Sequence, residues 1–144
     1  MRILLAVDEH QPSEQAVEKL VQQFRQKETE VRVIHVLQPI AFSAPPQMSP
    51  GYAPELQDFG RRAKDVLDHA AKSLTEAGFK TETLLRKGDI REEILKCAGE
   101  WKADLIMLGS HNHGGRFSIL GSVADSVARQ APCSVELVRS SNGH

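Results

Sequence analysis

Short apolar runs alternate with longer amphipathic stretches along this chain. The apolar runs are found at residues 2–8, 31–37, 80–86, 104–110 and 134–139. The first run is nearly continuous, as expected for a strand that is buried on both faces of a parallel sheet. The last run alternates, with Val135 and Leu137 on one face. The pattern therefore predicts five strands.

The stretches between these runs carry apolar residues at the spacing of amphipathic helices. The expected helix starts are Pro12 with Ser13, Glu55, Asp89 and Ser122. At the third start, Asp89 can cap the helix, and Glu92 stands three residues further on, as in a capping box. Five strands that alternate with four helices predict an α/β fold with a single open, mostly parallel sheet.

Residues 38–54 interrupt this alternation, because they hold five of the seven prolines. Proline lacks the amide donor and restricts the residue before it, so this segment is expected to be a long loop. Long loops in compact domains are often functional. The length of 144 residues fits one domain, 1–144, with this Pro-rich loop inside it.

Composition narrows the function classes. Lys and Arg number 18 against 19 Asp and Glu and form no block of one sign, which argues against nucleic acid and anionic membranes as partners. No apolar run approaches the ~20 residues that span a bilayer, and the first residues do not resemble a signal peptide. Cys97 and Cys133 form no CxxC motif, so reduced thiols are expected. These features predict a soluble, cytoplasmic protein.

The stretch "GSHNHGGRFSILGS", residues 109–122, joins the fourth strand to the fourth helix. Ligands of open α/β sheets bind beyond the carboxyl ends of the strands, and a helix N-terminus favours an anion. Gly121 would let the chain approach a phosphate, and the Ser122 hydroxyl could cap the helix or bond a phosphate oxygen. Asp8, directly after the first strand, could accept a ribose hydroxyl or bind Mg²⁺. The alternative is that the glycines only form turns and that Ser122 is only an N-cap.

The chain resembles the universal stress proteins over nearly its whole length. The likeness lies in "ILLAVDEHQPSEQAVE", "VRVIHVLQP", "KGDIREEIL" and "ADLIMLGSHNHGGRFSILGSVADSVARQAPCSVELVR". Nucleotide-binding members of the family carry Gly-x2-Gly-x9-Gly followed by Ser or Thr. The resemblance implies a Rossmann-like, adenine nucleotide α-hydrolase-like fold, with strand order 3-2-1-4-5 and helices on both faces. It also implies that ATP, with or without Mg²⁺, or another adenine nucleotide binds at the ends of strands one and four.

The resemblance also assigns binding positions in this sequence. Asp8 matches the acid that meets the ribose, and Val36 matches the residue whose backbone meets the adenine. The closing glycine and serine of the motif match Gly121 and Ser122. The full set that the resemblance implies is Ala6, Val7, Asp8, Val36, Gly109, Ser110, His111, Asn112, Gly121, Ser122, Val123 and Ala124. Val123 and Ala124 enter this set as the first helical amides under the phosphates.

Two departures from the family motif concern its loop. Asn112 stands where the second glycine is expected, although asparagine tolerates a left-handed backbone. Only eight residues separate Asn112 from Gly121, so the loop is one residue short of the family spacing. Either Gly114 and Gly115 absorb the difference, or the pocket is tighter and excludes a triphosphate.

Three functions remain open: a dimeric ATP-binding sensor or regulator of the stress response, a nucleotide-free dimeric scaffold, and a slow ATP hydrolase. The segment "VDEHQPSE" contains no glycine, which weighs against the adenylate chemistry of related enzymes. His111 and His113 could ligate a metal, but no third ligand is apparent, so no metal or catalytic residue is assigned. The uncovered edge strand 134–139 predicts a homodimer.

Overall fold

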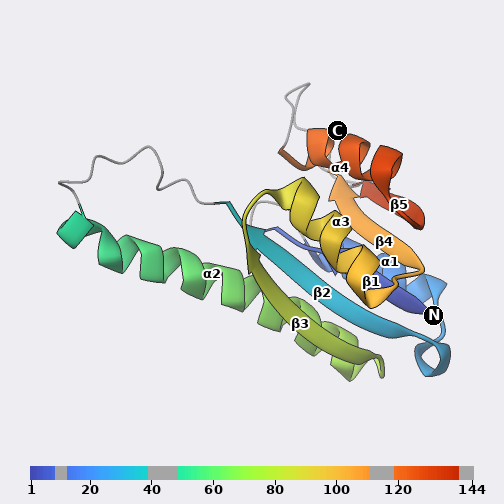
Figure 1. Cartoon of the computed structure of the whole chain (residues 1–144). Coiled ribbons are helices and arrows are strands. Elements are labelled where there is room, and N and C mark those ends of the chain that lie inside the picture. Colours follow the sequence, from blue (N-terminus) through green and yellow to red (C-terminus); the bar gives the residue numbers. More distant parts are fainter. Residues whose placement is uncertain (9–12, 39–48, 111–118, 140–144) are drawn as a thin grey trace.

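Five parallel strands form one sheet in the part of the chain that the structure describes. This computed structural model describes residues 1–8, 13–38, 49–110 and 119–139. The strands are β1 (Arg2–Ala6), β2 (Glu30–Leu37), β3 (Lys80–Lys87), β4 (Leu105–Ser110) and β5 (Ser134–Arg139). Their order is β3-β2-β1-β4-β5, and every neighbouring pair is parallel (Figure 1). The predicted fold class and strand order are confirmed.

Helices cover both faces of this sheet (Figure 1). They are α1 (Ser13–Gln23), α2 (Ser49–Glu76), α3 (Ile90–Trp101) and α4 (Ile119–Gln130), with one turn of 3-10 helix, η1 (Gln26–Glu28), before β2. We call the apolar layer under α1 and α2 the α1/α2 layer, which includes Ile3, Leu5, Leu20, Leu67 and Met107. The α3/α4 layer on the other face includes Leu4, Ala6, Ile34, Ile94 and Ile106.

The two layers explain why the first apolar run is nearly continuous. Successive side chains of a strand point to opposite faces, so Ile3 and Leu5 enter one layer and Leu4 enters the other. All three side chains are fully buried. Complete burial of such a side chain contributes about 1.5 to 3 kcal/mol. A strand covered on one face only would have an alternating pattern instead.

The prediction of a Pro-rich loop over 38–54 is wrong at its C-terminal end, because α2 begins at Ser49 and includes residues 50–54. Pro50 is the second residue of the helix, where the missing amide would have no helical partner. Pro54 lacks the amide for one helical hydrogen bond, yet the helix continues through it. The first turns of α2 extend beyond the end of the sheet (Figure 1). The rest of the predicted loop, 39–48, lies outside the described residues.

Helix α4 also begins earlier than predicted, at Ile119 rather than near Ser122. Ser122 suggested a helix start because serine is a good N-cap, but Ile119 and Leu120 already belong to the helix. Gly121 and Ser122 therefore lie in its first turn. The first four amides of a helix, counted from the N-cap residue, have no partner within it, so the free amides end at Gly121 and do not include those of Val123 and Ala124.

Helix α3 begins as predicted, with Asp89 at its N-cap position. The Asp89 backbone is extended, and its Oδ1 accepts a hydrogen bond from the Glu92 amide at 3.1 Å. This bond satisfies one of the free amides of the first turn. It also fixes the start of α3, which lies over the carboxyl ends of β1 and β2.

Asp89→Ala is expected to lower the free energy of unfolding by about 1 kcal/mol, the usual effect of losing an N-cap side chain. Urea unfolding followed by circular dichroism measures this change. Asp89→Asn is the matched control, because asparagine caps as well as aspartate. Equal destabilisation by both variants would mean that the charge of Asp89 matters and its capping bond does not.

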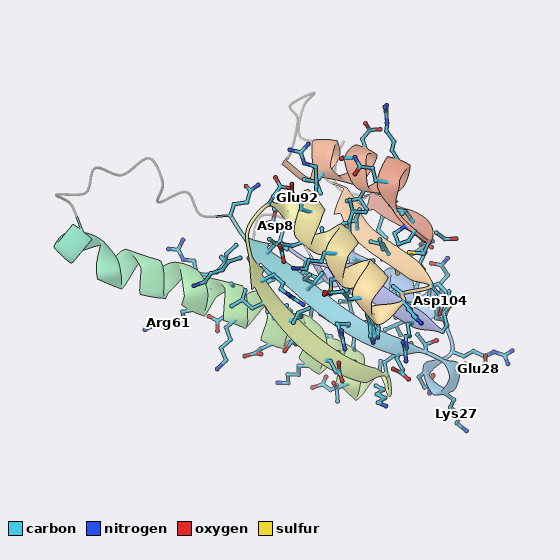
Figure 2. The ribbon with its side chains drawn as sticks, viewed as in Figure 1. Asp8, Lys27, Glu28, Arg61, Glu92 and Asp104 are labelled. Carbon is cyan, nitrogen blue, oxygen red and sulfur yellow. The ribbon has the colours of Figure 1, made fainter. Side chains whose placement is uncertain are left out.

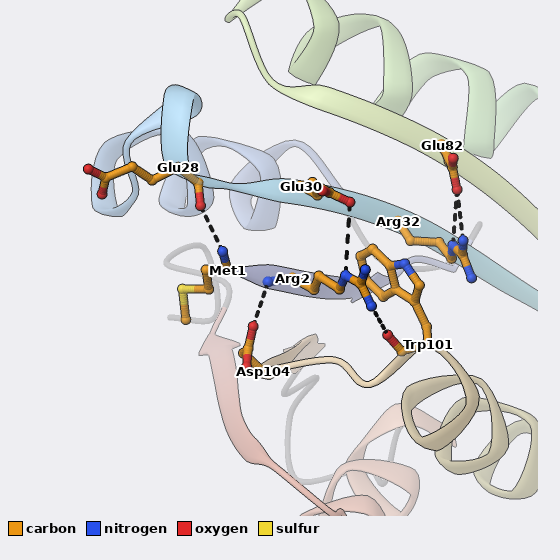
Figure 3. A network of polar contacts seen from close by, with 8 residues as sticks. All are labelled: Met1, Arg2, Glu28, Glu30, Arg32, Glu82, Trp101 and Asp104. Carbon is orange, nitrogen blue, oxygen red and sulfur yellow. Dashed lines mark hydrogen bonds and ion pairs between the residues drawn. The ribbon is translucent and has the colours of Figure 1, made fainter.

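At the amino ends of the strands, polar contacts tie β1 to the end of α3 (Figure 3). The Arg2 amide donates to Asp104 Oδ2 at 2.8 Å, and Arg2 Nη1 donates to the Trp101 carbonyl at 2.7 Å. The guanidinium of Arg32 lies over the Trp101 ring, 4.6 Å from its centroid. Figure 2 shows Asp104 at this end of the sheet and Asp8 at the other. Polar contacts therefore hold the amino end of the sheet together, while Asp8 lies at the carboxyl end.

Candidate functional site

A hollow opens at the carboxyl ends of β1 and β2, against the first turns of α3. It is lined by Ala6, Val7, Asp8, Ile34, His35, Val36, Ile90 and Ile94. Its empty volume is about 320 Å³ when the space open to solvent is included. Most of that space is open to solvent or narrow, since the volume that the centre of a water-sized group can reach is about 40 Å³. Parallel sheets bind ligands at this edge, so the hollow lies where a ligand is expected.

The walls of the hollow are mostly apolar. Ala6, Ile34, Val36 and Ile94 are buried members of the α3/α4 layer, and Ile90 packs against the same layer. Two polar side chains, Asp8 and His35, complete the lining. An apolar cavity with a few placed polar groups is the usual form of a small-molecule site.

Asp8 reaches the hollow because β1 remains bonded to β2 beyond its last strand residue. The Val7 amide donates to the Ile34 carbonyl at 2.9 Å. Asp8 is the next residue and is half-buried, whereas Val7 is 6% exposed. Figure 2 shows Asp8 near the beginning of α3. Its carboxylate therefore follows directly on the apolar end of the strand.

His35 is the second polar group of the lining, and its side chain is 7% exposed. Its Nδ1 lies 2.8 Å from the Val7 carbonyl oxygen. Because a carbonyl can only accept, Nδ1 donates this bond. His35 lies within the second apolar run, 31–37, and its burial shows that it packs in the core. Its place in the lining of the hollow was not predicted. A polar histidine near the end of an apolar strand is the sequence feature that could have indicated it.

The structure brings only some of the predicted site residues together. Ala6, Val7, Asp8 and Val36 line the hollow. Gly109 and Ser110 end the neighbouring strand β4, which pairs with β1 up to Ala6 opposite Leu108. His111 and Asn112 lie outside the described residues. Ile34, Ile90 and Ile94, which line the hollow, were not predicted for the site.

Gly121, Ser122, Val123 and Ala124 belong to α4, which follows β4 along the chain. The side chains of Val123 and Ala124 are 3% and 2% exposed and belong to the α3/α4 layer. These two residues therefore support the position of α4 through packing.

Comparison with known proteins decides the family. The model of the universal stress protein family, Usp, matches residues 1–139. The chain belongs to the universal stress protein family. Universal stress protein YxiE of Bacillus subtilis (strain 168) is 26% identical over 145 residues, which cover 96% of this chain and 98% of that protein.

Solved structures agree with this assignment. The hypothetical protein MJ0577 is 27% identical, with a TM-score of 0.78 over 98% of this chain and 96% of its own. The universal stress protein from Archaeoglobus fulgidus in complex with dAMP is 22% identical, with a TM-score of 0.70 over 96% of this chain and 97% of that one. The second likeness shows that this universal stress protein and that relative share a fold.

The thiols of this universal stress protein are packing residues. Both are free, and Cys97 is buried in the α3/α4 layer while Cys133 packs against it. Burial raises the pKa of the Cys97 thiol, and the positive charge of Arg32 offsets part of that rise. Burial also raises the pKa of Cys133. A raised pKa disfavours the reactive thiolate, so neither residue is prepared to act as a nucleophile.

Two further observations concern the described residues alone. They contain no group of three histidine, cysteine or acidic side chains that could hold a metal ion. His111 and His113, which could ligate a metal but were not assigned one, lie outside them. Within the described ranges, no helix has both the length and the apolar character that a bilayer crossing requires.

Proposed function

We propose that this universal stress protein binds adenine nucleotides, including ATP, in the hollow between β1, β2 and α3. The observation that carries the proposal is the apolar hollow with the Asp8 carboxylate beside it, at the carboxyl ends of parallel strands. The Archaeoglobus fulgidus relative, which has the same fold, is in complex with dAMP. The chain would act as a cytoplasmic regulator that responds to the nucleotide, with slow hydrolysis at most.

The chemistry of the lining suits such a ligand. Apolar walls that include Val36 and Ile90 would receive the base, and Asp8 would accept a hydrogen bond from a ribose hydroxyl. The phosphates would extend toward Gly109 and the first turn of α4, where Gly121 and Ser122 lie. The free amides and dipole at that helix end favour an anion. Mg²⁺ would bind mainly through the phosphates, as it does in many nucleotide sites.

Calorimetric titration with ATP, ADP and AMP, with and without Mg²⁺, tests the proposal. We expect Asp8→Ala to weaken binding by about 1.5 to 3 kcal/mol, or about 10- to 150-fold, because a charge-assisted hydrogen bond is lost. Asp125→Ala is the control, since this exposed aspartate of α4 pairs only with Arg129 at 3.3 Å among the ion pairs of the described residues. If Asp8→Ala binds like the wild type but melts far lower, Asp8 is a structural residue.

We also propose that the chain forms a homodimer through β5. Both β3 and β5 end the sheet, so each presents backbone groups that another chain could pair with. Four of the eight residues of β3 are charged, including a lysine at each end, whereas two of the six residues of β5 are charged. Charges, and lysine above all, protect an edge strand against pairing. Leu137 of β5 is 46% exposed and would be covered in such a dimer.

The short loop favours a second candidate, a nucleotide-free dimeric scaffold. Only eight residues lie between Asn112 and Gly121, one fewer than in the family motif. A scaffold would stay folded and dimeric while none of the three nucleotides bound. Binding without turnover would support the regulator, and release of inorganic phosphate from ATP would indicate the hydrolase.

A further inference from the structure

His35 has an unusual place in the core. Among the described residues, Thr29 and His35 are the buried side chains of polar type, and His35 alone of the two lines the hollow. Burying a polar side chain has a cost that its hydrogen bonds must offset. The bond from Nδ1 to the Val7 carbonyl, at 2.8 Å, is such a bond. It also fixes the tautomer, because Nδ1 must carry the proton in order to donate.

The bonded carbonyl is the one closest to Asp8 in the chain. It belongs to the peptide group that joins Val7 to Asp8, and a peptide group is planar. Holding the Val7 oxygen therefore fixes the direction in which the chain enters Asp8. The same residue is held a second time, since its amide donates to the Ile34 carbonyl at 2.9 Å. Both bonds come from β2, so β2 clamps the end of β1 from the side that faces it.

We infer that His35 is a positioning residue for the nucleotide site. By holding the Val7–Asp8 peptide, it orients the Asp8 carboxylate toward the hollow and so sets the affinity for an adenine nucleotide. This inference rests on the proposed function. It adds that the affinity depends on a side chain that acts through Asp8 and not through direct contact with the ligand.

The donor position distinguishes this role from simple packing. The amide nitrogen of an asparagine side chain occupies nearly the place of histidine Nδ1, whereas glutamine carries its amide one methylene further out. His35→Asn is therefore expected to keep the affinity for AMP within about threefold of the wild type, and His35→Gln to weaken it about tenfold. Calorimetry measures the affinity, and melting curves check that both variants fold.

A double-mutant cycle tests whether His35 acts through Asp8. If it does, His35→Gln should weaken AMP binding about tenfold in the wild type but less than about twofold in the Asp8→Ala background. A loss of affinity that is equal in both backgrounds would show a role independent of Asp8 and overturn the inference. Nitrogen chemical shifts of the imidazole ring give an independent check, because they report whether Nδ1 carries the proton.

The possible failures of this experiment are distinguishable. If the wild type binds neither ATP nor AMP, the proposed function fails and the inference fails with it. If the wild type binds AMP and His35→Gln binds it equally well, only the positioning role is overturned. A ring protonated at Nε2 alone would also overturn it, because Nδ1 could then not donate to Val7.

Discussion

Gly121→Val is expected to abolish adenine-nucleotide binding while the chain stays folded. Gly121 lies in the first turn of α4, where free amides can approach a phosphate closely. A glycine permits that close approach because it has no side chain, and a branched valine would occupy the space that the phosphates need. Calorimetry with ATP measures the loss, and a melting curve confirms that the fold persists.

The matched control is Gly99→Val in α3. This glycine is also helical, and a Cβ added to it would meet no atom within 4 Å outside its chain neighbours and the backbone of its own helix. Gly99→Val should therefore show the helix propensity of valine alone and leave the affinity unchanged. Tight binding by Gly121→Val would identify Gly121 as an ordinary helix residue and remove the first turn of α4 from the site.

The segment between β4 and α4 also allows a change that should strengthen ATP binding. One glycine inserted after Gly115 restores the family spacing, and lengthening a loop by one residue costs only tenths of a kcal/mol. If the short loop narrows the part of the site that would hold the phosphates, the insertion should raise the affinity for ATP more than the affinity for AMP. Equal affinities before and after insertion would mean that the missing residue is irrelevant to binding.

Leu137→Lys is expected to convert the proposed dimer into a monomer. Leu137 is exposed on the edge strand β5, and a lysine there would bring a charge into a strand pair formed by two copies. Analytical ultracentrifugation at several protein concentrations measures the change in mass. Val135 is a poorer choice for this test, because it packs against the α3/α4 layer and its loss would disturb the core.

Leu85→Lys is the control for this experiment. Leu85 lies on β3, the strand at the other edge of the sheet, and is 41% exposed, close to the 46% of Leu137. A dimer that survives Leu85→Lys but not Leu137→Lys supports an interface on β5. The reverse result would place the interface on β3.

Local signals predicted most of the fold. The run at 2–8 indicated a buried parallel strand because Ile3, Leu4 and Leu5 fill both layers, and Asp89 indicated a helix start because its capping bond reaches only three residues along the chain. The starts of α2 and α4 were predicted late. Proline is expected to stop a helix and serine to start one. However, α2 continues through Pro54, and α4 begins before Ser122.

The predicted site residues that line the hollow lie at or near strand ends. Asp8 was predicted because it follows a buried strand and matches the family pattern, and Val36 because it matches that pattern. Ile90 and Ile94 were not, since their place depends on how α3 lies over β1 and β2. The role of His35 was hidden for the same reason, because its partner, Val7, is 28 residues away in the sequence.

The sheet separates the α1/α2 layer from the α3/α4 layer, and substitutions in the two layers should differ in their effect on the proposed site. Ala6, Ile34, Val36 and Ile94 place the hollow mainly in the α3/α4 layer, while residues such as Leu20 and Leu74 belong to the other compartment. Substitutions on opposite sides of the sheet share few neighbours, so their effects should be nearly additive. Apart from Val7, which also lines the hollow, the α1/α2 layer should therefore tolerate substitutions with less effect on the proposed ligand site than the α3/α4 layer.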